Sequence, residues 1–179
     1  MKIRHVSTKE HIVPIWQQAT PETVQTAWEA AVKTWEDSED CKQLRSLFQA
    51  VPLPRVNKIV AFACSGFGDG SNRPCALYQH ALILTLRGIL ENRPDGEKVK
   101  CFVQDPIYTE TDERVLSNAR ITVLGDPRGF VEVDDQTLVI AFAPNIPVRQ
   151  IIADIAQPPV MVWNRVMSEA EAAAITNNR

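Results

Sequence analysis

Hydrophobic and polar positions repeat in two different ways along the chain, and the change comes near Pro54. Before it, apolar residues recur every three to four positions, which is typical of amphipathic helices. Thr20-Pro21 predicts a helix start, since Thr caps a helix and Pro is tolerated at its first position. The apolar stripe that follows consists of Val24, Ala27, Trp28, Ala31, Val32 and Trp35. A second helix is predicted over 38–50. Three tryptophans, Trp16, Trp28 and Trp35, are expected to pack these helices onto the rest of the protein.

After Pro54, short apolar runs alternate with helical segments. Strands are predicted over 59–64, 99–104, 120–124, 137–142 and 160–163. Helices are predicted over 71–90, 110–118 and 148–156, with a last helix opening at a capping box of Ser168 and Glu171. Residues 125–129 are predicted as a turn. This alternation favours an α/β fold: a Rossmann-like, doubly wound, mainly parallel five-stranded sheet over residues 55–179, with a helical extension over 1–54 packed on it.

Composition and charge narrow the function classes. The chain has 179 residues, of which 45 % are hydrophobic and 23 % charged, as in an ordinary globular protein. The net charge of −3 and the scattered basic residues argue against a nucleic-acid partner. From the sequence we expect neither a secretory signal nor a membrane-spanning segment. A cytoplasmic or nuclear protein with no membrane partner is therefore expected.

The side chains that usually carry chemistry are dispersed. The four cysteines, Cys41, Cys64, Cys75 and Cys101, show no metal-binding or disulfide spacing, so reduced thiols and no metal are expected. The sequence also shows no paired carboxylates and no activated nucleophile. Whether the protein is an enzyme stays open at this level.

The ends of the predicted strands are where a ligand site is expected. In open parallel sheets, ligands bind beyond the carboxyl ends of the strands, near the point where strand order reverses. The polar and glycine residues at those ends form the candidate cofactor-binding set. That set is Ser65, Gly66, Gly68, Gly70, Ser71, Asp105 and Asn145.

The glycine loop over 65–71 has two interpretations. Alternate glycines before a helix suit a cradle for a phosphate or carboxylate, because they permit positive φ and close approach. The dinucleotide pattern GxGxxG would need glycine where Ser71 stands, and methyltransferases usually have an acid where Cys64 stands. The loop is therefore either a ligand cradle or a tight structural turn.

Other strand ends carry similar alternatives. Asp105 is expected either to hold a ribose hydroxyl or to cap an Asp-Pro turn. Asn145 is expected to face the cleft or to cap the next helix, and Arg128 to face solvent. His80 and Gln79 are expected either to lie within reach of a ligand at the loop or to be hydrogen-bonded inside the core.

Several of these motifs resemble the "sensitivity to red light reduced" (SRR-type) domain family. The resemblance covers about residues 57–165 and rests on the stretches IVAFACSGFGDGS, ALYQHALIL, CFVQDPIYTETDERVL and ITVLGDPRGFVEVDDQTLVIAFAPNIP. It places the family's Gly-x-Gly at Gly66 and Gly68, its Tyr-Gln at Tyr78 and Gln79, and its Asp-Pro at Asp105 and Pro106. Asn145-Ile146 stands where the family has His-Cys, which puts any activity of that histidine in doubt here.

The resemblance implies regulation: light and clock signalling in plant members, and control of haem biosynthesis in yeast and animal members. The chain is similar to the stand-alone fungal versions. Three hypotheses follow. The protein is a regulatory domain that senses a nucleotide-like or other small anionic metabolite, a methyltransferase-like enzyme that uses S-adenosylmethionine, or an interaction module whose protein partner binds the N-terminal helices. Nucleotides and S-adenosylmethionine are the candidate cofactors.

Overall fold

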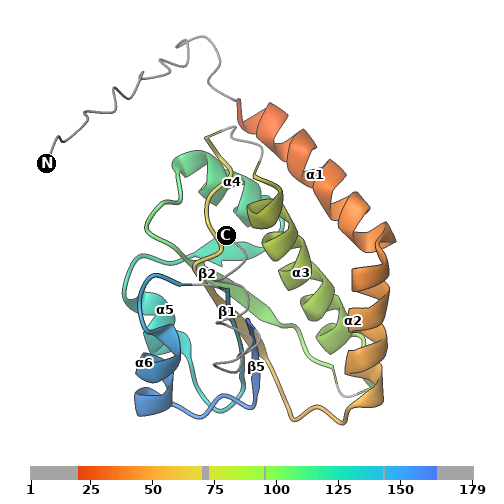
Figure 1. Ribbon diagram of the computed structural model, residues 1–179, viewed down its shortest axis with the longest axis vertical. Helices are drawn as coiled ribbons and strands as arrows, with labels where there is room; N and C mark the ends of the chain where they lie inside the picture. Colours follow the sequence, from red (N-terminus) through yellow and green to blue (C-terminus); the bar gives the residue numbers. More distant parts are fainter. Residues whose placement is uncertain (1–19, 70–72, 95, 143, 165–179) are drawn as a thin grey trace, which may run out of the picture.

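The computed structural model describes residues 20–69, 73–94, 96–142 and 144–164. Within these ranges the chain forms an α/β fold (Figure 1). Its helices are α1 (Pro21–Asp37), α2 (Glu39–Ala50), α3 (Pro74–Glu91), α4 (Glu110–Asn118), α5 (Arg128–Glu132) and α6 (Val148–Ile155). Its strands are β1 (Lys58–Phe62), β2 (Lys100–Gln104), β3 (Ile121–Val123), β4 (Thr137–Ala141) and β5 (Val160–Trp163).

The five strands form one sheet in the order β3-β2-β1-β4-β5, and every neighbouring pair is parallel. The chain leaves β1 toward β2 on one side and later returns to add β4 on the other. The strand order therefore reverses between β1 and β4, which is where a Rossmann-like sheet opens its crevice. The predicted fold class is confirmed.

Two helical layers cover the sheet because its central strands are apolar on both faces. Along β1, Ile59 and Ala61 belong to a core shared with α1, α3 and α4, whereas Val60 and Phe62 belong to a smaller core under α5 and α6. This alternation follows from the two-residue repeat of a strand. Figure 1 shows α1 lying against α3, and α5 beside α6.

The N-terminal helices are held by their tryptophans. Trp28 is 2 % exposed and stacks on Phe67, with ring centroids 6.1 Å apart. The indole N–H of Trp35 donates to Thr85 Oγ1 at 3.0 Å, and its ring lies against Tyr78. The expected packing role of Trp28 and Trp35 is confirmed, whereas Trp16 lies outside the described residues.

The structure changes some predicted boundaries. β1 ends at Phe62 rather than at residue 64, because Ala63 has a φ of 56° and leaves the extended conformation. The predicted turn over 125–129 runs into a helix that sequence analysis missed, α5, since Phe130 turns back onto Phe62 with ring centroids 4.6 Å apart. The predicted last helix, from Ser168, lies outside the described residues.

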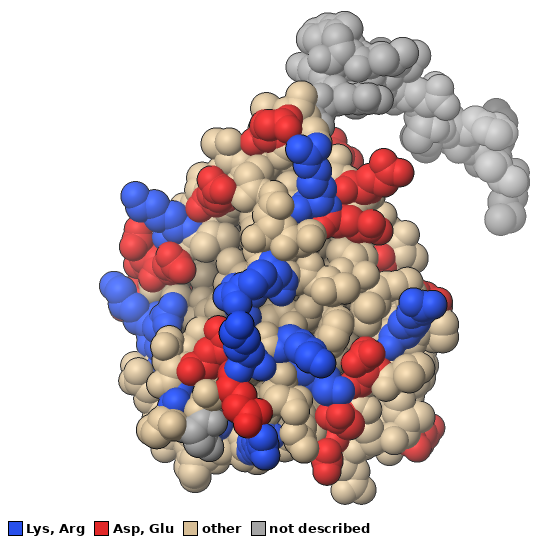
Figure 2. Space-filling model, turned by 180° about the vertical axis from the view of Figure 1, so that it is seen from behind, with Lys and Arg blue, Asp and Glu red and all other residues tan. Residues whose placement is uncertain are grey.

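The surface mixes both signs of charge. Figure 2 shows basic side chains gathered near the middle of the rear face, with acidic side chains around them. Among the described helices, none is long and apolar enough to cross a membrane.

Candidate functional site

The carboxyl edge of the sheet brings two predicted site residues together. Ser65 follows β1 and Asp105 follows β2, and these strands are neighbours. The backbone N–H of Ser65 donates to Asp105 Oδ2 at 2.9 Å, and that of Ile107 donates to Asp105 Oδ1 at 3.2 Å. Asp105 thus holds the turn after each strand.

The loop after β1 uses its glycines for close approach. The left-handed residues here are Ala63 and Ser65, with φ of 56° and 62°, whereas Gly66 and Gly68 lie outside that region. A Cβ on Gly68 would clash with Thr109 Oγ1 and lie 2.7 Å from the backbone N of Asp112. The expectation that the glycines supply positive φ is wrong at these two positions, because they make room for the start of α4.

A carboxylate of the chain itself accepts hydrogen bonds from the backbone of the loop. Asp112 is fully buried, and its Oδ1 accepts the backbone N–H groups of Phe67 at 2.8 Å and Gly68 at 2.7 Å. Its Oδ2 accepts the backbone N–H and the hydroxyl of Thr109, both at 2.8 Å. These are the donors that a cradle would offer to a phosphate. In this structure they bind an internal anion.

Sequence analysis did not single out Asp112, although a signal was present. Thr109-x-x-Asp112 is a capping box at the start of α4, with both reciprocal hydrogen bonds formed. That pattern predicts a helix start. It does not predict that the same carboxylate reaches a loop more than forty residues earlier.

An aromatic cluster fills the space below the loop. Phe67 is 3 % exposed and meets the ring of His80 edge-on at 5.0 Å. His80 Nδ1 lies 2.7 Å from the carbonyl of Ala76, so Nδ1 carries the proton and Nε2 accepts the hydroxyl of Tyr108 at 2.8 Å. Burial lowers the pKa of His80 to about 4. His80 is therefore a neutral, satisfied core residue, one of its two expected roles.

The remaining predicted residues are more dispersed. Gly70 and Ser71 lie outside the described residues. Asn145 is exposed after β4, and Arg128 is exposed on α5. The Oε1 atom of Gln79 is buried and has no hydrogen-bond partner among the described residues.

Three of the four thiols lie inside the core. Cys41, Cys64 and Cys101 are buried, and Cys75 is exposed. Burial raises the pKa of Cys64 to about 12 and that of Cys101 to about 11, which keeps both protonated. In the part of the chain that the structure describes, no three His, Cys, Asp or Glu side chains are placed to hold a metal ion.

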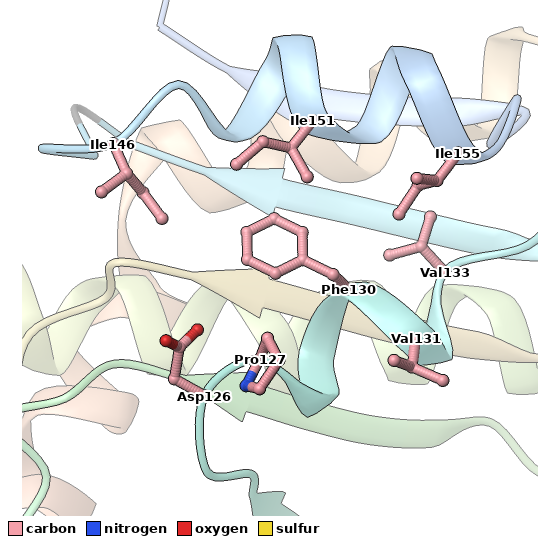
Figure 3. Close-up of a pocket in the computed structure, with 8 residues that line it drawn as sticks. All are labelled: Asp126, Pro127, Phe130, Val131, Val133, Ile146, Ile151 and Ile155. Atoms are coloured by element: carbon pink, nitrogen blue, oxygen red, sulfur yellow. The ribbon is translucent and has the colours of Figure 1, made fainter.

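On the face of the sheet that α5 and α6 cover, an open apolar groove of about 620 Å³ lies between these two helices (Figure 3). Phe130 forms its floor, and Ile151 and Ile155 project from α6 toward it. Asp126 stands at one end with its carboxylate directed toward the groove. The residues that line it are Asp126, Pro127, Phe130, Val131, Val133, Ile146, Ile151 and Ile155.

Several apolar side chains that line the groove are exposed to solvent. Val131 is 81 % exposed, Ile155 54 % and Ile146 49 %. Asp126 Oδ1 accepts the side-chain N–H of Gln104 at 2.9 Å, and Gln104 Oε1 accepts the N–H of Gly129 at 2.5 Å. The polar end of the groove is therefore held in place from β2.

Comparison with models of protein families finds a match over most of the chain. The family model described as the SRR1 domain matches residues 40–176, well over half of the chain. No curated protein and no solved structure matches it.

Proposed function

The chain belongs to the SRR1 domain family, a signalling or regulatory family, and from this premise we propose that it is a regulatory domain that senses a small molecule in the groove between α5 and α6. The observation that carries the proposal is the groove itself. Ligand pockets of about 300–1,000 Å³ are mostly apolar and hold a few convergent polar groups. A volume of about 620 Å³, seven apolar side chains and one carboxylate fit that description.

The chemistry of the groove defines the ligand class. Its walls favour an apolar body, whose burial contributes about 25 cal/mol for each Å² removed from water. Asp126 favours a hydrogen-bond donor or a cation at one end. The expected ligand is therefore a largely apolar molecule with one such group.

The glycine loop is a weaker candidate for the sensing site. The amides of Ser65, Phe67 and Gly68 already bind Asp105 and Asp112. An anionic metabolite would have to replace a buried carboxylate there, and separating a buried charge from its partners is costly. A methyltransferase-like activity would meet the same obstacle.

A thermal-shift screen tests the proposal. The panel contains NAD, NADP, S-adenosylmethionine, ATP, GTP and haem. It also contains apolar metabolites that carry one hydrogen-bond donor or one amine. At a hundred times its dissociation constant, a ligand stabilises the fold by about 2.7 kcal/mol, which raises the melting temperature by about 5–10 °C.

Two variants locate the binding site. Ile146→Trp places a large ring in the groove. Leu47→Trp is the control, since it adds the same ring on α2 at a side chain that is 59 % exposed in the native chain. The proposal expects a compound that stabilises the native chain and Leu47→Trp but not Ile146→Trp. A shift that survives Ile146→Trp and is lost in Asp105→Ala would assign the ligand to the glycine loop and refute the groove.

A further inference from the structure

A second hollow, of about 510 Å³, lies at the amino ends of β2 and β3. Among the strands that the structure describes, β3 lies at the edge of the sheet. The hollow is lined by Glu91, Lys98, Val99, Lys100, Cys101, Phe102, Ser117, Arg120, Ile121 and Thr122. It is separate from the groove of Figure 3, with which it shares none of its lining residues.

Positive charge distinguishes this hollow. Lys98, Lys100 and Arg120 are exposed, and within the described part of the chain none of their side chains forms an ion pair or a hydrogen bond. The one acidic lining residue, Glu91, accepts the backbone N–H of Val99 at 3.0 Å. Three cations against one carboxylate leave an excess of two positive charges, in a chain whose net charge is −3.

Several basic side chains elsewhere on the molecule are paired with carboxylates. Lys58 binds Asp134 at 2.8 Å, Arg73 binds Asp69 at 3.1 Å, and Lys42 binds Glu39 at 2.6 Å. Three cations that line one hollow without such partners repel each other. An anion bound among them would relieve that repulsion.

The other polar groups of the hollow suit a phosphate. Ser117 and Thr122 add hydroxyl donors beside the three cations. Charge-assisted hydrogen bonds from Lys and Arg to phosphate oxygens are about twice as strong as neutral ones. A volume of about 510 Å³ has room for a small phosphorylated molecule.

We propose that this basic hollow binds a phosphorylated small molecule through Lys98, Lys100 and Arg120. The site is independent of the groove between α5 and α6. It would allow an anionic metabolite to act on the protein without entering the glycine loop.

The backbone conformation at Arg120 allows a substitution that removes the charge without straining the fold. Arg120 follows α4 and its C-cap Ala119 with a φ of 60°, a conformation in which glycine is the usual residue. Arg120→Gly therefore removes the charge while relaxing the backbone. The variant is expected to be folded and at least as stable as the native chain.

The test titrates the full chain with inorganic pyrophosphate at constant ionic strength and follows backbone amide shifts by NMR. The proposal expects saturable shifts around residues 98–102 and 117–122. Affinity should fall at least tenfold in Arg120→Gly and in Lys100→Gln. Lys33→Gln removes the same charge from α1 and should leave the affinity unchanged.

Three results would overturn the proposal. One is an equal loss of affinity in Lys33→Gln, which would indicate a general charge effect. Another is a non-saturating shift that sulfate reproduces, which would indicate an adventitious ion only. A third is a set of shifts centred on residues 65–69, which would move the anion site to the glycine loop.

Discussion

Replacing Asp112 by Asn should strongly destabilise the fold. The carboxylate accepts four hydrogen bonds, two at each oxygen, from Phe67, Gly68 and Thr109. An Asn side chain keeps one acceptor oxygen and presents an NH₂ group in place of the other. Whichever way the amide is turned, two donors lose their acceptor and face another donor.

The magnitude follows from those two lost bonds. A hydrogen bond to a charged group contributes about 1.5–3 kcal/mol, and the bonds to Phe67 and Gly68 are buried, so water does not replace an acceptor lost there. Thr109 is exposed, so water offsets part of the loss when the amide turns its NH₂ group toward Thr109. The free energy of unfolding should fall by about 2–3 kcal/mol. For a chain of this length that lowers the melting temperature by about 4–12 °C.

Urea unfolding followed by circular dichroism measures the loss. Asp135→Asn is the matched control, since Asp135 is exposed and should tolerate the same change within about 0.5 kcal/mol. Thr109→Ala should give an intermediate loss of about 1 kcal/mol, typical of an N-cap. A loss below about 1 kcal/mol in Asp112→Asn would refute the account of the loop as closed by an internal carboxylate.

Three further predictions concern the loop, α3 and the residues between them. Gly68→Ala should destabilise the fold, because its Cβ would meet the backbone of α4. Gly88→Ala has open space at its Cβ and should stabilise α3 by about 0.5–1 kcal/mol. Thermal unfolding of the two variants measures the two opposite effects. Tyr108→Phe leaves His80 Nε2 without its donor and should lose about 1–3 kcal/mol in urea unfolding, while an unchanged midpoint would contradict the bond. The pKa of His80 is about 4 in the folded protein and about 6.5 in the unfolded chain. The stability that the neutral imidazole contributes is therefore complete above pH 6.5. It is lost as the pH falls toward 4, by up to about 3 kcal/mol. His80→Asn should flatten that part of the stability–pH curve, and an equal slope in both proteins would argue against it.

The closure of the loop also changes how Gly68 variants are interpreted. A substitution there alters the packing of α4 as well as the loop, since the nearest atoms belong to Thr109 and Asp112. Loss of ligand binding in Gly68→Val would therefore not by itself identify a cradle. Variants at the rim of the groove, such as Ile146→Trp, avoid this problem.

Sequence alone determined the features that depend on local pattern. The stripe from Val24 to Trp35 predicted α1, and the apolar run at Ile59 predicted β1, because burial on one or both faces sets the spacing of apolar residues. Alternating strands and helices then predicted the parallel sheet. That sheet placed Ser65 and Asp105 in one candidate set at the carboxyl ends of the strands, and the structure brings these two residues into contact.

Tertiary structure decided what surrounds the predicted site. The partner of the loop amides is Asp112, which is distant in sequence and is brought there because β1 and β2 are neighbours and α4 follows β2. The groove likewise depends on α5, too short for a periodic pattern, and on the width left between it and α6. The spacing of apolar side chains along a helix or strand predicts which of its residues are buried. It does not predict which distant group fills a loop or where two helices leave a gap, because those depend on packing between elements.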